Sequence, residues 1–392
     1  MGELARSRVV RRLAAVAVAA VAVAVGGWQR ARAVERLPPD YDELIYLPAA
    51  YRYAERMAPG RWSEIPQVKE NPEHPPLVKL AFAAALRSSG DPAPPPEPDW
   101  DKLKVGKPLP DAARPPFLVA RWTSWTAGVL QLAAVGVAAP LGALLLAVEP
   151  YHAKYTSQAY LEAIPGLFAL LAVLALERGI ERRAGPQRPP WRKPAFWLSA
   201  VALGLATAGK YPYGLVLGLT LGPFVVAHAR GRALVWAGYA AAVVAVFVLA
   251  DPFLWPAPVQ RLMDSVGFHW TYSHGEHVRK TGLPWYASLH FLTHAEPLRW
   301  HRDVFFTGAT AWLLPALALI GAPVAARRRP VWASWALTGM CFLFVWPTKW
   351  PQYLLLVLPA LCTCAAHAPA SVMQLSGWAR DRLRRARASA SG

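Results

Sequence analysis

Residues Ala233–Ala250 read ALVWAGYAAAVVAVFVLA, eighteen consecutive positions without a charge. A second uncharged stretch, Leu13–Trp28, follows a basic N-terminus. A helix of about 20 apolar residues crosses the hydrocarbon core of a bilayer, so both stretches are typical of membrane-spanning helices. The whole chain of 392 residues agrees, because 55% of its residues are hydrophobic and its mean hydropathy is +0.22. These values exclude a soluble globular enzyme and a disordered chain.

Other apolar stretches extend this pattern along the chain. The three cysteines all lie inside such stretches, which excludes a disulfide-rich secreted scaffold. We predict an all-α polytopic membrane protein with about ten transmembrane helices: Leu13–Trp28, Phe117–Val137, Ala139–Tyr151, Tyr160–Leu176, Ala195–Gly209, Tyr213–Ala229, Ala233–Ala250, Val304–Ala325, Val331–Trp346 and Tyr353–Met373.

The positive charge supports this count. Twenty of the 42 basic residues lie in five segments, which carry only four acidic residues and so account for most of the net charge of +18. Basic residues in short loops mark the cytoplasmic side, and the five segments share one side only if the passes between them pair up. Phe117–Tyr151 must then be a hairpin that turns near Ala139 and Pro140. The basicity is thus a topology signal and does not indicate nucleic acid.

This topology places both termini in the cytoplasm of a cell with the protein in its plasma membrane, and two long loops outside. Loops of this length in a compact protein are usually functional, so we expect the active site on the outer face. The predicted parts of the chain are a cytoplasmic N-terminus with the first helix (1–28), a first outer loop (29–116), helices two to seven (117–250), a second outer loop (251–302), helices eight to ten (303–373) and a basic cytoplasmic tail (374–392).

The first apolar stretch has an alternative interpretation. A basic start, an apolar stretch and Ala31-Arg32-Ala33 also fit a signal peptide with a cleavage motif. Within the first outer loop, Leu47–Met57 and Leu77–Leu86 have apolar residues at helical spacing, typical of amphipathic helices at a membrane surface.

Acidic residues gather in the predicted outer parts. Asp40, Asp42 and Glu43 follow the first helix closely, and adjacent carboxylates there can provide a general base or a metal ligand; the plain alternative is that they cap the next helix. Glu162 lies at the outer end of the fourth pass, where an ionisable residue is by default a functional candidate.

A second group follows from the sequence Asn71-Pro72-Glu73-His74-Pro75-Pro76-Leu77. Its prolines fix the backbone after His74 and hold Glu73 and His74 in a defined direction, unless the segment is only a turn into a helix. Lys210 and Lys349 each follow a short outward pass. Either lysine alone can snorkel to the interface, but together they indicate a pocket for a lipid phosphate.

A third group is rich in histidine and aromatic residues, FHWTYSHGEH at 268–277. Its His269 and His274, with Glu73, are candidate ligands for a divalent metal. The spacing fits no closed structural zinc site, and sugar binding by the same residues is the alternative.

Taken in order, these segments resemble the GT-C-fold glycosyltransferases. The likeness rests on Asp42-Glu43, the His74-Pro75-Pro76-Leu77 turn, Glu162, Gly204 to Lys210, and Lys349 through Tyr353 to Pro359. More narrowly, the chain is similar to the protein O-mannosyltransferase group (glycosyltransferase family 39) and to the lipid A aminoarabinose transferases. Glu162 stands where that family usually has Asp, and the chain is shorter than the family's other members.

The resemblance implies a GT-C-like bundle whose outer loops carry the site, and an enzyme that transfers a sugar from a polyprenyl-phosphate donor. The acceptor is a hydroxyl on a protein or on an envelope glycolipid or glycan. It further implies that Asp42, Glu43 and Glu162 are catalytic, that Lys210 and Lys349 bind the donor phosphate, and that His74 and Tyr353 position the substrate. Glu73 matches a carboxylate that binds a metal in the aminoarabinose enzyme.

Two other classes remain as alternatives. A membrane transporter or flippase concentrates ionisable residues near the midplane and often has internal repeats, whereas these charges lie in long outer loops and no repeat is visible. A non-catalytic membrane scaffold is the second alternative.

Overall fold

The computed structural model describes residues 2–90, 94–181, 189–305 and 310–378, and all regular elements within these ranges are helical. Arg182, Arg183 and Arg188, which belong to the basic segment after the predicted fourth pass, and the basic residues at 380–387 of the predicted tail lie outside the described residues. The prediction of an all-helical chain is confirmed for the described part.

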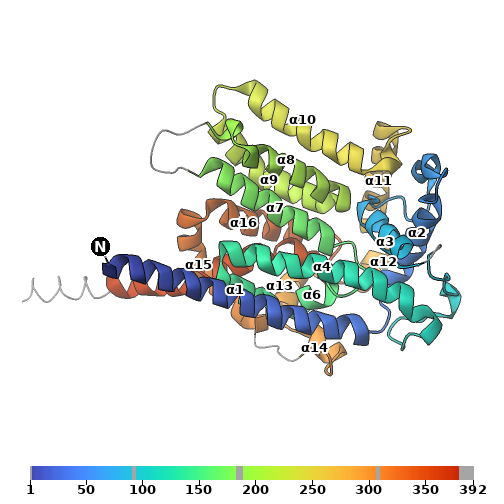
Figure 1. Cartoon of the computed structure of the whole chain (residues 1–392), viewed down its shortest axis with the longest axis horizontal. Helices are drawn as coiled ribbons and strands as arrows, with labels where there is room; N and C mark the ends of the chain where they lie inside the picture. Colours follow the sequence, from blue (N-terminus) through green and yellow to red (C-terminus); the bar gives the residue numbers. More distant parts are fainter. Residues whose placement is uncertain (1, 91–93, 182–188, 306–309, 379–392) are drawn as a thin grey trace, which may run out of the picture.

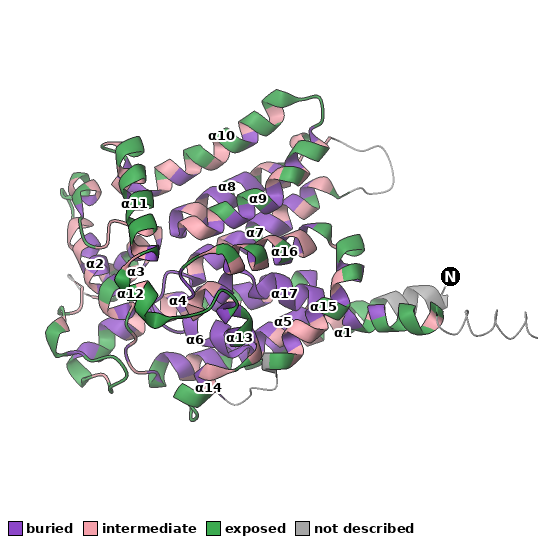
Figure 2. Ribbon diagram, turned by 180° about the vertical axis from the view of Figure 1, so that it is seen from behind, coloured by how far each residue is buried: buried purple, intermediate pink, exposed green. Residues whose placement is uncertain are grey.

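In the described part of the chain, eight helices run side by side in one bundle (Figure 1). α7 packs on α8, which also contacts α10, and α1 packs against α4. Their buried faces form the main apolar core, drawn purple in Figure 2. The eight helices are α1 (Gly2–Arg36), α4 (Arg114–Ala138), α7 (Ala163–Ile180), α8 (Pro194–Gly209), α9 (Tyr211–His228), α10 (Ala233–Ala250), α15 (Thr310–Arg328) and α16 (Pro330–Val345).

The outside of the bundle is apolar. In the described part of the chain, Val9–Arg36, Ala163–Ile180 and Ala233–Ala250 are long and apolar enough to cross a membrane, and α8 and α16 are shorter apolar helices. α10 exposes Leu234 and Leu249 at 89% and 70%. Contiguous apolar surface of this kind is rare on soluble proteins and is stable against lipid, so the protein is embedded in a membrane. The count of ten passes stays a prediction.

The predicted hairpin over Phe117–Tyr151 is present, but its second arm is short. α4 ends at Ala138, and α5 (Pro140–Val148) runs back beside it. Both helices pack on α1, where Gly26 lies against Leu132 of α4 and Ala147 of α5. α5 has nine residues, about 13 Å of helix, which is too short to cross a bilayer alone. α6 (Pro150–Tyr155) follows it after Glu149, so the predicted third pass is two short helices.

The predicted last pass is interrupted in the same way. A 3₁₀ helix, η6 (Pro351–Leu356), precedes α17 (Leu358–Ala365), and residues 368–378 form a further helix. Pro351 and Pro359, at the first positions of η6 and α17, fix the backbone and lack an amide donor, which explains why the apolar run does not form one continuous helix.

The first predicted outer loop and the first part of the second fold at one end of the bundle, whereas α13 (Ala287–Thr293) of the second loop packs on α15. α2 (Glu43–Arg56) packs on α3 (Leu77–Ser89), and α11 (Pro258–Ser273) and α12 (Glu276–Thr281) lie at the same end (Figure 1). The α9–α10 and α15–α16 connections and the start of α1 lie at the opposite end. Both predicted amphipathic helices therefore exist, but their apolar faces pack in a second protein core around Leu47 and Phe82.

The first helix is part of the bundle. α1 continues without a break through Ala31-Arg32-Ala33 and buries Ala33 completely. Arg30 is fully buried and donates to the carbonyls of Leu146 and Ala147 at 3.1 and 3.0 Å. These contacts give the segment a structural role that a cleaved signal peptide does not have.

Candidate active site

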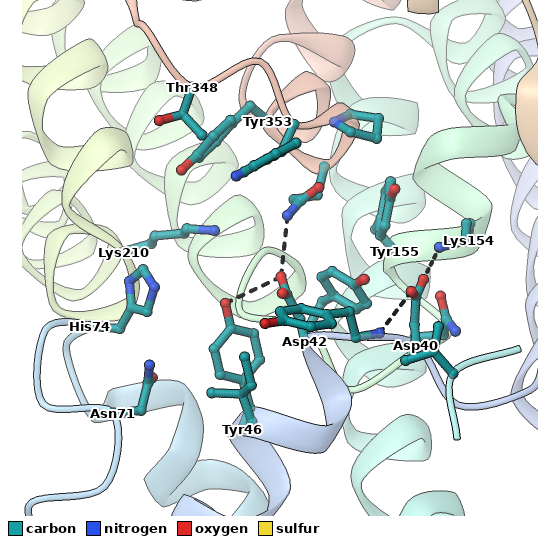
Figure 3. A pocket seen from close by; sticks show the side chains of 18 of the residues that line it. Asp40, Asp42, Tyr46, Asn71, His74, Lys154, Tyr155, Lys210, Thr348 and Tyr353 are labelled. Atoms are coloured by element: carbon teal, nitrogen blue, oxygen red, sulfur yellow. Dashed lines mark hydrogen bonds and ion pairs between the residues drawn. The ribbon is translucent and has the colours of Figure 1, made fainter. Parts of the chain in front are cut away.

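A cavity of about 690 Å³ opens at the end of the bundle that carries the two long loops. Its walls come from the start of α2, the turn before α3, α6, the α8–α9 turn, α11 and the segment before η6. Figure 3 shows the cavity with Asp42 near its centre. The predicted site residues that line it are Asp42, Glu73, His74, Lys210, His269 and Tyr353.

Asp42 occupies the N-cap position of α2 but does not act as a cap, since its side chain accepts no bond from the helix amides. Its Oδ2 accepts a hydrogen bond from the Tyr46 hydroxyl at 3.3 Å and from Gln352 Nε2 at 3.2 Å. Burial, then the negative charge of Glu162, raises the pKa of Asp42 to about 7. A carboxylate with that pKa is suited to general-base chemistry near neutral pH.

Glu43 points away from the cavity, although it is the next residue. Its side chain is fully buried and forms a two-point ion pair with Arg121, with N–O distances of 2.7 and 2.6 Å. The amides of Ala159 and Asp40 also donate to it, at 2.8 and 3.1 Å. Glu43 therefore joins α2 to α4 and to the start of α7, which supports a structural rather than a catalytic role.

Glu162 and Lys210 form a second buried ion pair beside the cavity. The tight packing of Gly209 on Pro165 brings the α8–α9 turn against the start of α7, since a Cβ at Gly209 would lie 2.7 Å from that proline. The Lys210 ammonium also lies 5.0 Å from the centre of the Tyr353 ring. Oε2 of Glu162 is buried without a hydrogen-bond partner, so this pair has spare capacity to bind a ligand.

The Asn71–Leu77 segment forms a tight turn at the cavity wall. Asn71 has a φ of +54°, and Lys79 donates to the carbonyls of Asn71 and His74, at 2.5 and 2.9 Å. The His74 ring lies 5.9 Å from that of Tyr46, and its Nδ1 is buried without a partner. Burial, then the charge of Lys210, lowers the pKa of His74 well below its ordinary value, so this imidazole is neutral at pH 7.

The predicted metal ligands do not converge. His269 lines the cavity, and its Nε2 lies 3.1 Å from the backbone carbonyl of Glu73. His274 is exposed outside the cavity and its Nδ1 lies 2.8 Å from the carbonyl of Trp270. Within the described ranges, no three His, Cys, Asp or Glu residues gather as a metal site would require. The structure therefore does not bring the three predicted ligands together, and the metal stays a prediction.

Lys349 also lies away from the cavity lining. Its ammonium donates to the carbonyls of Leu343 and Phe344 at 2.7 and 2.9 Å, at the C-terminal end of α16. Cations there satisfy the last carbonyls of a helix. The structure therefore places Lys210, but not Lys349, where a ligand in the cavity can reach it.

The fold has a counterpart among solved structures. No family model and no curated protein matches the chain. The crystal structure of ArnT from Cupriavidus metallidurans bound to undecaprenyl phosphate is similar over 96% of this chain, with a TM-score of 0.54 and 18% sequence identity. ArnT is a lipid A aminoarabinose transferase with a GT-C fold.

This chain has a GT-C fold. The match covers 63% of the ArnT chain, so this chain spans less than two thirds of the length of that neighbour. The expectation of an ArnT-like GT-C bundle, drawn from the ordered motifs, is confirmed at the level of the fold.

One charged pair of this GT-C cavity was missed in the sequence. Lys154 of α6 forms an ion pair with Asp40, and both residues line the cavity. The sequence patterns singled out Asp40 only as a neighbour of Asp42 and did not single out Lys154. The signal present in the sequence is that Lys154 is the only Lys, Arg, Asp or Glu in the segment 150–161.

Proposed function

We propose that the protein is an integral membrane glycosyltransferase that transfers a sugar from a polyprenyl-phosphate donor to a hydroxyl acceptor on the outer face of the plasma membrane. The observation that carries this proposal is the position of Asp42, a carboxylate with a raised pKa that faces the cavity close to Lys210 and Tyr353. The GT-C fold and the binding of undecaprenyl phosphate by ArnT support the class of donor.

The cavity residues suit a displacement at the anomeric carbon. Asp42 accepts the proton of the acceptor hydroxyl, whose oxygen forms a bond to that carbon. The bond from the same carbon to the phosphate oxygen breaks, and the polyprenyl phosphate leaves with its electron pair. The Lys210 ammonium stabilises the negative charge on the departing phosphate, as fixed positive charge in a water-poor site does. Glu162 holds that ammonium in place.

The arrangement of charge also bears on the two alternative classes. The ionisable residues of the cavity lie at the loop end of the bundle, where the headgroup of a lipid-linked sugar would lie. This arrangement does not favour a transporter, whose binding site lies near the bilayer midplane. The basic residues counted along the sequence support a cytoplasmic position for the opposite end.

The test is a turnover assay in proteoliposomes with an undecaprenyl-phosphate-linked sugar labelled in the sugar. We expect wild-type protein to cleave the sugar–phosphate bond and Asp42→Asn to lower turnover by about 10²- to 10⁴-fold. Asp101→Asn, an exposed carboxylate of the same loop, is the matched control. Lipid movement without bond cleavage would indicate a flippase, and wild-type turnover in Asp42→Asn would overturn the role of this residue.

A further inference from the structure

The cavity has two chemically different ends on either side of Asp42. Lys210, His74 and Asn71 lie on one side in Figure 3, and the ion pair of Asp40 with Lys154 lies on the other, next to Tyr155. The proposed mechanism uses only the Lys210 end. The Asp40 end has no part in binding the donor phosphate, so its construction needs a separate explanation.

Aromatic rings surround the charged pair at the Asp40 end. The Lys154 ammonium is 3% exposed and lies 4.3 Å from the centre of the Tyr155 ring, 5.6 Å from that of Tyr160 and 5.7 Å from that of Trp300. These distances are within the range of cation–π attraction. Trp300 is itself about half exposed and lines the cavity, so one face of this cluster is open to a ligand.

The charges at this end cancel. Burial alone would raise the pKa of Asp40, but the charge and hydrogen bond of Lys154 outweigh it and hold the pKa below its ordinary value. The carboxylate is thus ionised at neutral pH, and its other oxygen accepts the Tyr41 amide at 2.8 Å. Since Lys154 is already neutralised and Asp42 lies nearby, the cluster offers no net attraction to an anion.

An ionised carboxylate that is 24% exposed can still accept hydrogen bonds from a ligand. Hydroxyl groups are the donors that suit it, and the large apolar faces of Trp300 and Tyr155 suit the face of a sugar ring. In a displacement, the attacking hydroxyl approaches from the side opposite the leaving phosphate. The Asp40 end lies on that side when the phosphate is at Lys210.

We infer that Asp40, Lys154, Tyr155 and Trp300 form the acceptor subsite, and that the acceptor is a neutral carbohydrate rather than an anionic glycolipid or a polypeptide. The inference rests on the proposed function. It assigns Asp40 to the acceptor's hydroxyl groups and Trp300 to its ring, and leaves Asp42 as the base.

The test measures the binding of acceptor analogues without any reaction. Purified protein in lipid nanodiscs is titrated with methyl glycosides of glucose, galactose, mannose and N-acetylglucosamine, and binding is followed by saturation-transfer difference NMR. Glycerol 3-phosphate and an acetylated Ser-Thr peptide amide are the anionic and peptide arms. We expect at least one glycoside to bind and neither comparison compound to do so. Binding of the phosphate or peptide in place of every glycoside would overturn the inference.

Two variants locate the binding. Asp40→Asn should weaken the glycoside at least about tenfold, since hydrogen bonds to charged groups are the strong ones, and Trp300→Ala should weaken it about 3- to 10-fold. Trp285→Ala, an exposed tryptophan outside the cavity lining, should leave the affinity unchanged. Equal affinity in wild type, Asp40→Asn and Trp300→Ala would overturn the assignment.

Folding and donor binding are controlled separately. The double variant Asp40→Asn/Lys154→Gln removes both charges and avoids an unpaired buried lysine, so it should lose the glycoside while its thermal unfolding stays close to wild type. Undecaprenyl phosphate alone should bind wild type and Asp40→Asn equally and bind Lys210→Met more weakly. Failure of this lipid to bind wild type would count against the proposed function, whereas loss of the glycoside result alone would count against the subsite.

Discussion

Two buried ion pairs stand close together in this protein and differ in how completely their oxygens are used. In the Glu43–Arg121 pair, both carboxylate oxygens accept from the guanidinium, and Arg121 also donates to the carbonyls of Val34, Leu37 and Pro38. In the Glu162–Lys210 pair, one carboxylate oxygen has no partner and the lysine lines the cavity. The difference indicates that the first pair stabilises the fold and the second is available to a substrate.

The largest expected effect is the loss of stability on breaking the Glu43–Arg121 pair. Arg121→Met leaves Glu43 buried without its cation, which costs about 3–5 kcal/mol of stability. We expect a marked loss of folded protein, measured by thermal unfolding in nanodiscs. Arg114→Met, an exposed arginine at the start of the same helix, is the control. An unchanged melting temperature for Arg121→Met would contradict the conclusion that the Glu43–Arg121 pair stabilises the fold.

Breaking the Glu162–Lys210 pair should lower the turnover rate. Lys210→Met removes the positive charge proposed to meet the leaving phosphate, a loss of about 3–4 kcal/mol in the barrier or about 10²- to 10³-fold in turnover. The assay is the proteoliposome reaction at saturating donor, with Arg327→Met at the opposite end of the bundle as control. Full activity in Lys210→Met would place the phosphate elsewhere, and the second outer loop with Arg279 and Lys280 would be the next candidate.

The pH dependence of turnover tests the electrostatic coupling between the Glu162–Lys210 pair and Asp42. With an Asp42 pKa of about 7, turnover should fall about tenfold per pH unit below 7, because the base must be ionised. Glu162→Gln removes a negative charge that raises this pKa, so the profile should move to lower pH. A profile that stays in place in this variant would show that Asp42 is not the group being titrated.

The same pKa has a consequence for stability with a defined sign. The folded state holds the Asp42 proton up to about pH 7, whereas the ordinary value is 3.8, so the free energy of unfolding falls as pH rises between these values. Asp42→Asn should remove this part of the pH dependence and melt higher than wild type at pH 8. Parallel melting curves for the two proteins across pH 4 to 8 would contradict the raised pKa.

The smallest effect is expected at the lysine that lies outside the cavity. Lys349→Met removes a cation from the last carbonyls of α16 and should cost about 1 kcal/mol or less of stability, with turnover within about twofold of wild type. This reverses the expectation from the sequence, in which both lysines bound the phosphate. A loss of turnover comparable with that of Lys210→Met would restore the original assignment.

Local patterns of apolar and basic residues predicted the parts of the fold that depend on neighbouring residues. Apolar runs predicted the long helices α1, α4, α7 and α10, and paired basic segments predicted the hairpin that turns at Ala139. The predicted third pass, Ala139–Tyr151, is already short in the sequence, and only the distribution of basic residues made it a full pass. In the structure Pro140 and Glu149 bound α5, which is too short to span a bilayer alone.

The site was predictable as a region but not in the direction of each side chain. Asp42 and Glu43 are adjacent at the start of α2, yet only Asp42 faces the cavity. Glu43 instead pairs with Arg121 of α4, which is 78 residues further along the chain. Lys210 and Lys349 had equivalent places in the sequence. The Glu162 carboxylate holds Lys210, whereas the backbone carbonyls at the end of α16 hold Lys349. Contacts between distant segments are needed for both distinctions.

The burial of Arg30 constrains the order in which the chain assembles during synthesis. An arginine inside a membrane helix costs about 2.5–3.5 kcal/mol until it finds partners. Within its own helix Arg30 donates to the Gly26 carbonyl. Its other partners include carbonyls 116 and 117 residues further along the chain and the Thr156 hydroxyl, 126 residues away. The outer end of α1 thus reaches its final environment only after residues 146–156 have left the ribosome and entered the membrane. Because α6 also carries Lys154, the same step places one wall of the cavity, whereas the walls that carry Lys210, His269 and Tyr353 come from later segments of the chain.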